Sequence, residues 1–365
     1  MNAVPAVTSP LFRSPVAEAM REAMAGGMDF PEMRDLLDLT ENLHGLARVD
    51  VLDTIAHRGR AFPLISVAFG PDDPRAPVLA LFGGVHGLER IGTRIVLSYL
   101  RTLSELARWD RITREMLKTT RIVLFPLVNP VGMLLKRRSN GNGVDLMRNS
   151  PVRADGIGRW HLFAGHSISP RLPWYQGTAG APMEAEAQAV CKLVREEIFP
   201  ASIALVVDVH SGYGNRDRIW FPYARTRDPF PRVPEVLALK GLLDSTYPHH
   251  IYCVEPQSRQ YVTHGDLWDY LYDDYHARGA PGHFIPFTLE LGSWVWVRKN
   301  WWQLFDRLGA FNPHLPHREQ RALRRHLHLF DFLYRAVQSP EPWAAMGDGS
   351  RERLMGHAVG LWYAK

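Results

Sequence analysis

The stretch IALVVDVHS, from Ile203 to Ser211, is an almost unbroken apolar run that ends in a histidine and a serine. Strands that are covered on both faces have this composition, because the side chains on both faces are buried among apolar residues. In a strand covered on one face only, every second side chain would be polar. RIVLFPLVNP, from Arg121 to Pro130, has the same character, and APVLALFGGV, from Ala76 to Val85, is a further β-like run. We therefore predict buried strands at the centre of a sheet.

Segments with helical and strand patterns alternate around these runs. Apolar residues recur at spacings of three and four from Ile95 to Leu106, which predicts a helix. The other expected elements are strands at 49–57, 62–70 and 284–291 and helices at 16–25, 33–43, 183–199, 233–247, 265–277 and 317–337. Such alternation is typical of an α/β protein. We predict a three-layer α/β/α fold with a mixed, largely parallel central sheet.

The chain has 365 residues, of which 46% are hydrophobic, and can bury a large core. It contains no internal repeat and no low-complexity linker. We predict a helical arm over residues 1–48, one catalytic domain over 49–339 and a C-terminal tail over 340–365.

Charge and cysteine content argue against several classes of protein. The 43 Lys and Arg residues against 38 Asp and Glu give a net charge of +5, too small and too scattered to indicate a nucleic-acid partner. Cys191 and Cys253 form no CxxC motif and no disulfide framework, so we expect a reducing, cytoplasmic location. Prolines and charges interrupt any N-terminal signal core, and no run of about 18 apolar residues occurs. We expect a small peptide or acyl-amino-acid substrate, and neither a nucleic-acid nor a membrane partner.

Four polar residues fall at or near the ends of predicted strands, where the loops of an α/β sheet bind ligands. His86 and Glu89 follow the run that ends at Val85, His210 comes at the end of its own run, and Glu290 lies within FIPFTLELG. Catalytic zinc sites use three protein ligands and keep one position open for water. His86, Glu89 and His210 supply such a His₂Glu set, which predicts one Zn²⁺ per chain. Glu290 then remains as a general base for a water molecule.

Each of these residues also has an ordinary explanation. An HxxE pair is common by chance, and a histidine at a strand end is more often hydrogen-bonded than bound to metal. Glu290 between two leucines is harder to dismiss, because a carboxylate in a buried strand is costly unless it is paired or used. The polar stretch KRRSNGNGVDLMRNSP, from Lys136 to Pro151, is either a solvated loop or an anion-binding loop with forked arginine donors. Taken together, the residues favour a site.

The motifs GGVHGLE, NPVG with RSNGNGVDLMRN, DVHS and FTLEL occur in this order between Val49 and Leu291. This ordered set resembles the metallocarboxypeptidases, the zinc exopeptidases related to carboxypeptidase A. The resemblance implies their fold, zinc held by His86, Glu89 and His210, and a general base and acid at Glu290.

The resemblance also implies roles for four further residues. Arg138 is similar to the arginine that polarises the scissile carbonyl and stabilises the oxyanion, and Arg148 to the arginine that binds the terminal carboxylate of the substrate. Asp145 resembles the carboxylate that orients the first zinc histidine. Tyr261 is similar to the tyrosine that closes over the substrate. Three other tyrosines lie close to it in the sequence: Tyr270, Tyr272 and Tyr275.

The chain departs from the family pattern at position 147. The family has Asn-Arg, both binding the terminal carboxylate, where this chain has Met147-Arg148, and methionine donates no hydrogen bond. The tryptophan-rich stretch LGSWVWVRKNWWQLF after Glu290 is expected to pack a C-terminal subdomain, with a hydrophobic substrate wall as the second interpretation.

We therefore predict a zinc metallocarboxypeptidase that removes a C-terminal amino acid from peptides. A second hypothesis is a zinc deacylase of N-acyl amino acids, resembling aspartoacylase and succinylglutamate desuccinylase, since GGVHGLERIG fits that group about equally well. A third is a catalytically silent binding protein, in favour of which only Met147 argues.

Overall fold

A computed structural model describes residues 15–158 and 161–364. Its centre is an eight-stranded sheet with the order β1-β2-β4-β3-β5-β8-β6-β7. The strands are β1 (Arg48–His57), β2 (Arg60–Phe69), β3 (Val78–Gly83), β4 (Arg121–Phe125), β5 (Ile203–Ser211), β6 (Arg218–Phe221), β7 (Cys253–Pro256) and β8 (His283–Leu291). The central strands β4, β3, β5 and β8 are parallel, while β1 with β2, β2 with β4, and β6 with β8 are antiparallel. The predicted mixed, largely parallel sheet is confirmed.

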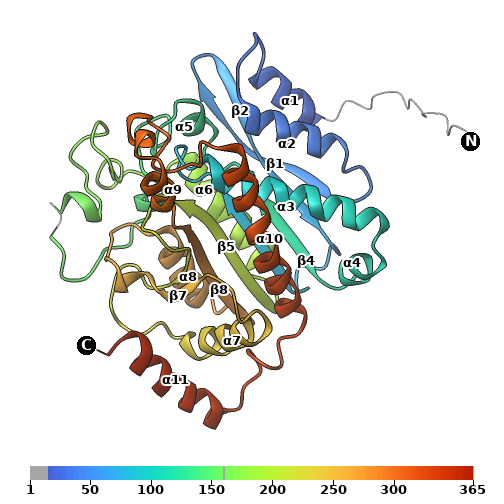
Figure 1. Cartoon of the computed structure of the whole chain (residues 1–365), viewed down its shortest axis with the longest axis vertical. Helices are drawn as coiled ribbons and strands as arrows, with labels where there is room; N and C mark the ends of the chain where they lie inside the picture. Colours follow the sequence, from blue (N-terminus) through green and yellow to red (C-terminus); the bar gives the residue numbers. More distant parts are fainter. Residues whose placement is uncertain (1–14, 159–160, 365) are drawn as a thin grey trace, which may run out of the picture.

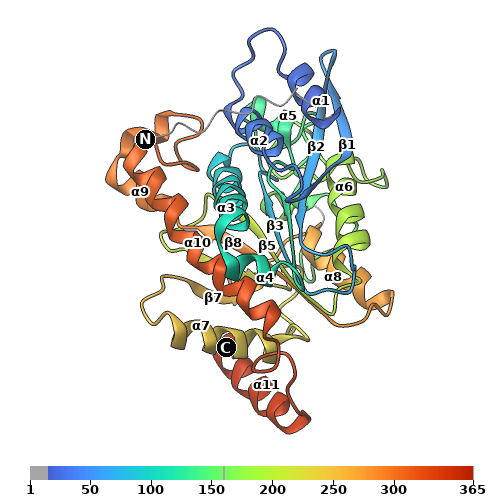
Figure 2. The ribbon, with the colours of Figure 1, turned by 90° about the vertical axis from the view of Figure 1, so that its right-hand side faces the viewer.

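Helices cover both faces of this sheet (Figure 1; Figure 2). On one face lie α3 (Arg90–Trp109) and α10 (Pro316–Gln338), and on the other lie α6 (Ala185–Leu193) and α8 (Leu267–Ala277). The remaining α-helices are α1 (Pro15–Ala23), α2 (Pro31–Glu41), α4 (Arg111–Met116), α5 (Pro130–Leu134), α7 (Val233–Thr246), α9 (Trp294–Lys299) and α11 (Asp348–Trp362). The three-layer arrangement follows from the sequence pattern, because β3, β4 and β5 are buried along their whole length.

Strand register brings the candidate site residues to one end of the sheet. Gly83 at the end of β3 pairs with Val209 on β5, and His210 pairs with Glu290 on β8. From β3 the chain continues to β4 on one side, while β5 lies on the other. The carboxyl ends of β3 and β5 therefore form a switch point, where open α/β sheets bind ligands.

Some elements escaped prediction from the sequence. The strands β6 and β7 have four residues each, too few to establish a period. The predicted C-terminal tail contains α11, whose glycines Gly356 and Gly360 weaken a helical pattern. Trp362 near its end is buried and donates from Nε1 to the Val254 carbonyl at 2.9 Å. The tail thus packs onto the sheet domain, and the division into three parts stays a prediction.

None of the helices in the described part of the chain has both the length and the apolar character needed to cross a bilayer.

Candidate active site

The loop that carries the HxxE pair leaves β3 through a glycine in the left-handed region. Gly84 has a φ of +69°, and a Cβ there would lie 2.3 Å from Thr93 Oγ1. Asn129, which follows β4, steadies the loop by donating from Nδ2 to the Val85 carbonyl at 3.1 Å. The glycine after the strand thus permits a tight backbone passage into the loop.

The structure brings His86, Glu89 and His210 together in a buried group. One ligand atom from each lies within 4.8 Å of the other two, and the imidazole centroids are 5.0 Å apart. Glu89 Oε2 lies 3.1 Å from His210 Nδ1 and accepts a hydrogen bond from Ser211 N at 3.0 Å. All three predicted ligands therefore converge, although His86 and Glu89 come from the loop after β3 and His210 comes from the end of β5.

The donor atoms of this group fit a divalent metal ion. Two imidazole nitrogens and one carboxylate oxygen are a set that catalytic zinc uses. Burial, with help from Arg138, lowers the pKa of His86 to about 4, so its ring is neutral and can offer a lone pair. Its Nδ1 is buried and finds no hydrogen-bond partner among the described residues. Burial by itself would raise the pKa of Glu89, but His86, His210 and Arg138 keep it below its ordinary value and the carboxylate ionised. That the metal is zinc stays a prediction.

Asp208 is a site residue that the sequence interpretation missed. It lies two residues before His210 on β5, so the two side chains project from the same face of the strand. Its Oδ2 is 2.8 Å from His210 Nε2 and accepts from the Trp268 indole at 3.0 Å. Burial would lower the pKa of His210, but Asp208 and Glu89 raise it well above its ordinary value. The available signal was the pattern DVH, two polar residues on one face of a buried strand.

Glu290 lies beside the His-Glu-His group without belonging to it. It is buried at the end of β8, and its Oε1 accepts from Tyr213 N at 3.0 Å. Burial and the neighbouring Glu89 raise the pKa of Glu290 to about 8. A carboxyl group with a high proton affinity next to a metal-ligand set is what a general base and acid requires.

Arg138 reaches the group from the polar loop after α5. Its Nη2 lies 2.7 Å from His86 Nε2, and its Nη1 lies 3.4 Å from Glu89 Oε1. The side chain is 25% exposed and lines the pocket described below. The guanidinium therefore faces both the candidate ligands and the space in front of them.

Asp145 anchors this arginine. Its Oδ2 accepts from Arg138 Nε at 2.8 Å, whereas its Oδ1 lies 3.7 Å from His86 Nδ1, beyond hydrogen-bond distance. Burial would raise the pKa of Asp145, but Arg138, His86 and Arg148 hold it well below its usual range. Asp145 thus positions Arg138 directly, and its role in orienting His86 stays a prediction.

Arg148 and Met147 are buried next to each other on the 3-10 helix η1 (Leu146–Arg148) and line the same pocket. Arg148 Nη1 donates to the Met147 carbonyl at 3.3 Å. Its Nε has no hydrogen-bond partner, and no carboxylate of the described residues forms an ion pair with this arginine. A buried guanidinium that forms no direct ion pair with a described carboxylate is suited to bind an anionic ligand.

Tyr261 also lines this pocket, together with aromatic side chains that the sequence did not single out. Burial raises the pKa of Tyr261 to about 12, so its hydroxyl keeps its proton and can donate. The three alternative tyrosines, Tyr270, Tyr272 and Tyr275, do not line the pocket. The pocket has a volume of about 630 Å³, and its unpredicted aromatic lining comes from separate loops: Phe163, Trp174, Tyr213, Trp220 and Phe311.

Most of the tryptophan side chains in the stretch after Glu290 are more exposed than the sequence predicted. Trp294, Trp301 and Trp302 are each more than half exposed, and none of them lines this pocket. The expectation of packing is wrong for these three side chains, whereas Trp296 in the same stretch is partly buried and packs against the core. Tryptophan content alone does not reveal which way a loop turns its side chains.

Comparison with known proteins places the chain in a family. The family model described as zinc carboxypeptidase matches residues 39–293, more than half of the chain. Carboxypeptidase SOL1 of Arabidopsis thaliana is 27% identical over 108 residues, which covers 29% of this chain and 22% of that protein. The chain thus spans less than a quarter of the length of the curated relatives it matches.

Solved structures share the fold. Bovine thrombin-activatable fibrinolysis inhibitor, in complex with tick carboxypeptidase inhibitor, has a TM-score of 0.55 at 17% identity and covers 89% of this chain and 94% of its own. Carboxypeptidase A from Helicoverpa armigera has a TM-score of 0.55 at 19% identity, covering 90% of this chain and 73% of that one. Because the family model matches more than half of its length, the chain belongs to the zinc carboxypeptidase family.

Proposed function

We propose that the protein is a metallocarboxypeptidase, which hydrolyses the amide bond next to a free carboxylate. The observation that supports this most is Arg148, a buried cation in the pocket next to the His-Glu-His group without an ion-pair partner among the described residues. A terminal carboxylate is the ligand that a forked guanidinium binds best. A substrate whose leaving amino acid carries a free carboxylate would form an ion pair with the Arg148 guanidinium.

Zinc held by His86, Glu89 and His210 would supply Lewis-acid activation of water and of the carbonyl. Glu290 takes the proton of the attacking water, since its raised pKa makes it a strong enough base. It then returns this proton to the leaving amine nitrogen.

Arg138 stabilises the negative charge that develops on the carbonyl oxygen. Its guanidinium stays charged, because Asp145 and Glu89 raise its pKa against the effect of burial. The ion pair with Asp145 holds the donors in place before the substrate arrives, so little reorganisation is needed during the reaction.

The test combines metal analysis with one substitution. We expect about one zinc per chain by elemental analysis, and Glu290→Gln to keep this zinc while losing about 10²- to 10⁴-fold in turnover. Unchanged turnover would show that the base is another residue. Stoichiometric zinc without hydrolysis of any peptide or N-acyl amino acid would instead support the silent binding protein.

A second candidate is the deacylase, which Met147 favours because it removes one donor from the carboxylate clamp. A panel of dipeptides and N-acyl amino acids separates the two activities. Turnover of N-acyl amino acids alone would replace the carboxypeptidase proposal.

We also propose a cytoplasmic location, supported by the two free cysteines Cys191 and Cys253. Fractionation of the source cells tests it.

A further inference from the structure

The segment between β8 and α10 presents a cluster of large apolar side chains outside the fold. Their exposed fractions run from 54% to 75%. We call the cluster the aromatic platform, and its members are Trp294, Trp301, Trp302, Leu304 and Phe305. Scattered apolar residues on a surface are ordinary, but a contiguous cluster marks an interaction site.

Specific contacts hold the platform in this outward arrangement. The rings of Trp301 and Trp302 stack with centroids 4.1 Å apart, and Phe305 lies within 5.9 Å of both. Gln303, which lies between Trp302 and Phe305 in the sequence, is buried. Its Nε2 donates to the Gly309 carbonyl at 2.9 Å, and this hydrogen bond fixes the turn. Trp294 donates from Nε1 to the Gly212 carbonyl at 2.8 Å. The segment therefore uses side-chain hydrogen bonds to the backbone to keep its aromatic rings facing water.

Cations lie close to the platform residues in the sequence. Arg298, Lys299 and Arg307 lie within the same segment, and none of them forms an ion pair with a described carboxylate. Aromatic rings with interleaved unpaired cations are typical of surfaces that meet an anionic, partly apolar partner.

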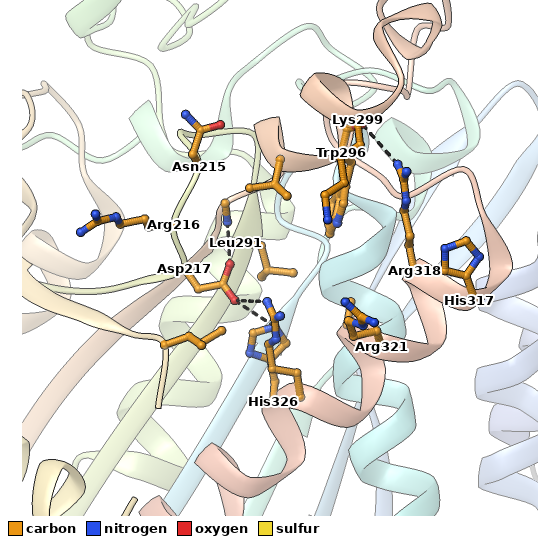
Figure 3. Close-up of a pocket in the computed structure, with 15 residues that line it drawn as sticks. Asn215, Arg216, Asp217, Leu291, Trp296, Lys299, His317, Arg318, Arg321 and His326 are labelled. Carbon is orange, nitrogen blue, oxygen red and sulfur yellow. Dashed lines mark hydrogen bonds and ion pairs between the residues drawn. The ribbon is translucent and has the colours of Figure 1, made fainter. Parts of the chain in front are cut away.

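A basic pocket of about 450 Å³ opens between α9, the helix that carries Trp294 of the platform, and α10; its lining residues are drawn in Figure 3. Trp296 and Lys299 border it from α9, and Arg318, Arg321 and Arg325 border it from α10. Asp217 is the one carboxylate among its lining residues, and it lies 3.3 Å from Arg325 Nη1. The pocket thus keeps a surplus of positive charge suited to a phosphate group.

We propose that the aromatic platform and the basic pocket dock the protein onto an anionic phospholipid surface, with a lipid phosphate in the pocket. Indole rings favour the interface between headgroups and acyl chains, and each cation near an anionic membrane adds attraction. The prediction that the protein has no membrane partner rested on the lack of a membrane-spanning segment. Peripheral docking onto a membrane requires no such segment.

Other occupants fit the surface less well. A two-fold contact between copies of this chain would set the platform's own cations against each other, which costs energy. Single-stranded nucleic acid requires open ring faces for its bases, whereas Trp301 and Trp302 stack on one another.

The test is co-sedimentation of the full chain with vesicles of phosphatidylcholine alone or with about one third phosphatidylglycerol. We expect binding to the anionic vesicles only, weakening as salt rises. The double variant Trp301→Ser/Phe305→Ser should lose at least about tenfold in affinity, and Arg321→Gln about fivefold. Matched controls are Trp109→Ser, a tryptophan 68% exposed at the end of α3, and Arg324→Gln, which does not line the pocket.

Several outcomes would overturn the proposal. They are equal binding to both vesicles, no binding, or equal losses in the variants and their controls. Binding of pyrophosphate without vesicle binding would assign the pocket to a soluble anion. Two further results, each without vesicle binding, would reassign the platform. A dimer that Trp301→Ser dissociates would assign it to a second copy of the chain. Oligonucleotide binding that Trp301→Ser weakens would assign it to nucleic acid. Because no readout involves hydrolysis, this proposal and the proposed function fail independently.

Discussion

Met147 places an apolar side chain in the pocket beside Arg148, the residue that we propose binds the substrate carboxylate. Its buried thioether contributes no donor, so a carboxylate there must rely on the guanidinium and on Tyr261. Substrate affinity at this position is therefore set by fewer hydrogen bonds than an asparagine side chain would allow.

Met147→Asn should restore a donor to the pocket wall. One hydrogen bond to a charged group contributes about 1.5–3 kcal/mol, so we expect kcat/KM for a dipeptide to rise about ten- to a hundredfold, mainly through KM. Met147→Leu, which keeps the apolar character, should change little. A fall in kcat/KM for Met147→Asn would indicate that the substrate presents an apolar group here.

The second prediction for a single residue concerns Asp208. It fixes the ring of His210, and loss of such a partner costs about 10- to 100-fold in metal affinity. We expect Asp208→Asn to weaken zinc binding by this factor in a competition titration with a chelator. Trp268→Phe, which removes only the donor to Asp208, should have a smaller effect. Equal affinity in Asp208→Asn would show that the strand alone orients His210.

At the scale of elements, the loop between α9 and α10 is tied to the start of α3. Asn312 accepts from Ile91 N at 2.9 Å, and its Nδ2 donates to the Leu88 carbonyl at 2.7 Å. Ile91 lies in the first turn of α3, where backbone amides have no partner within the helix. A side chain 221 residues away thus supports both this helix and the loop between His86 and Glu89.

Replacing this side chain should destabilise the fold. We expect Asn312→Ala to lower the free energy of unfolding by about 1–2 kcal/mol, measured by urea denaturation. Asn312→Asp keeps the acceptor for Ile91 N and loses the donor, so its loss should be smaller. Equal losses in the two variants would show that the bond to Leu88 dominates.

For the whole molecule, the buried His326 links stability to pH. Burial lowers its pKa to about 4, with Asp217 opposing and Arg325 reinforcing the shift. Its Nδ1 lies 3.0 Å from the Tyr252 hydroxyl. The unfolded chain takes up the proton near pH 6.5 and the folded chain only near pH 4, so stability falls as pH falls through this window.

Proton uptake by His326 in the unfolded chain lowers the free energy of unfolding by about 2 kcal/mol between pH 7 and pH 5. We expect His326→Gln to reduce the difference in unfolding free energy between these two pH values by about that amount. His328→Gln, at an exposed position on the same helix, is the control and should leave the pH dependence unchanged. The same slope in all three proteins would mean that His326 takes up its proton equally in both states.

Local sequence predicted much of the site. His86 and Glu89 are three residues apart on one loop, and His210 and Glu290 end apolar runs, so strand ends alone indicated where they meet. Asp208, Tyr213 and the aromatic wall were missed, because their roles depend on distances between segments far apart in the chain.

The sequence by itself determined the buried parallel strands, the three-layer fold and the His₂Glu set, because hydrophobic periodicity and motif spacing are local properties. Only the tertiary structure decided the rest: which carboxylate contacts His210, that Arg148 lies buried without an ion pair among the described residues, and that Trp294, Trp301 and Trp302 face outward. Burial and contact arise from packing between segments, and a side chain's charge and exposure are set by those neighbours.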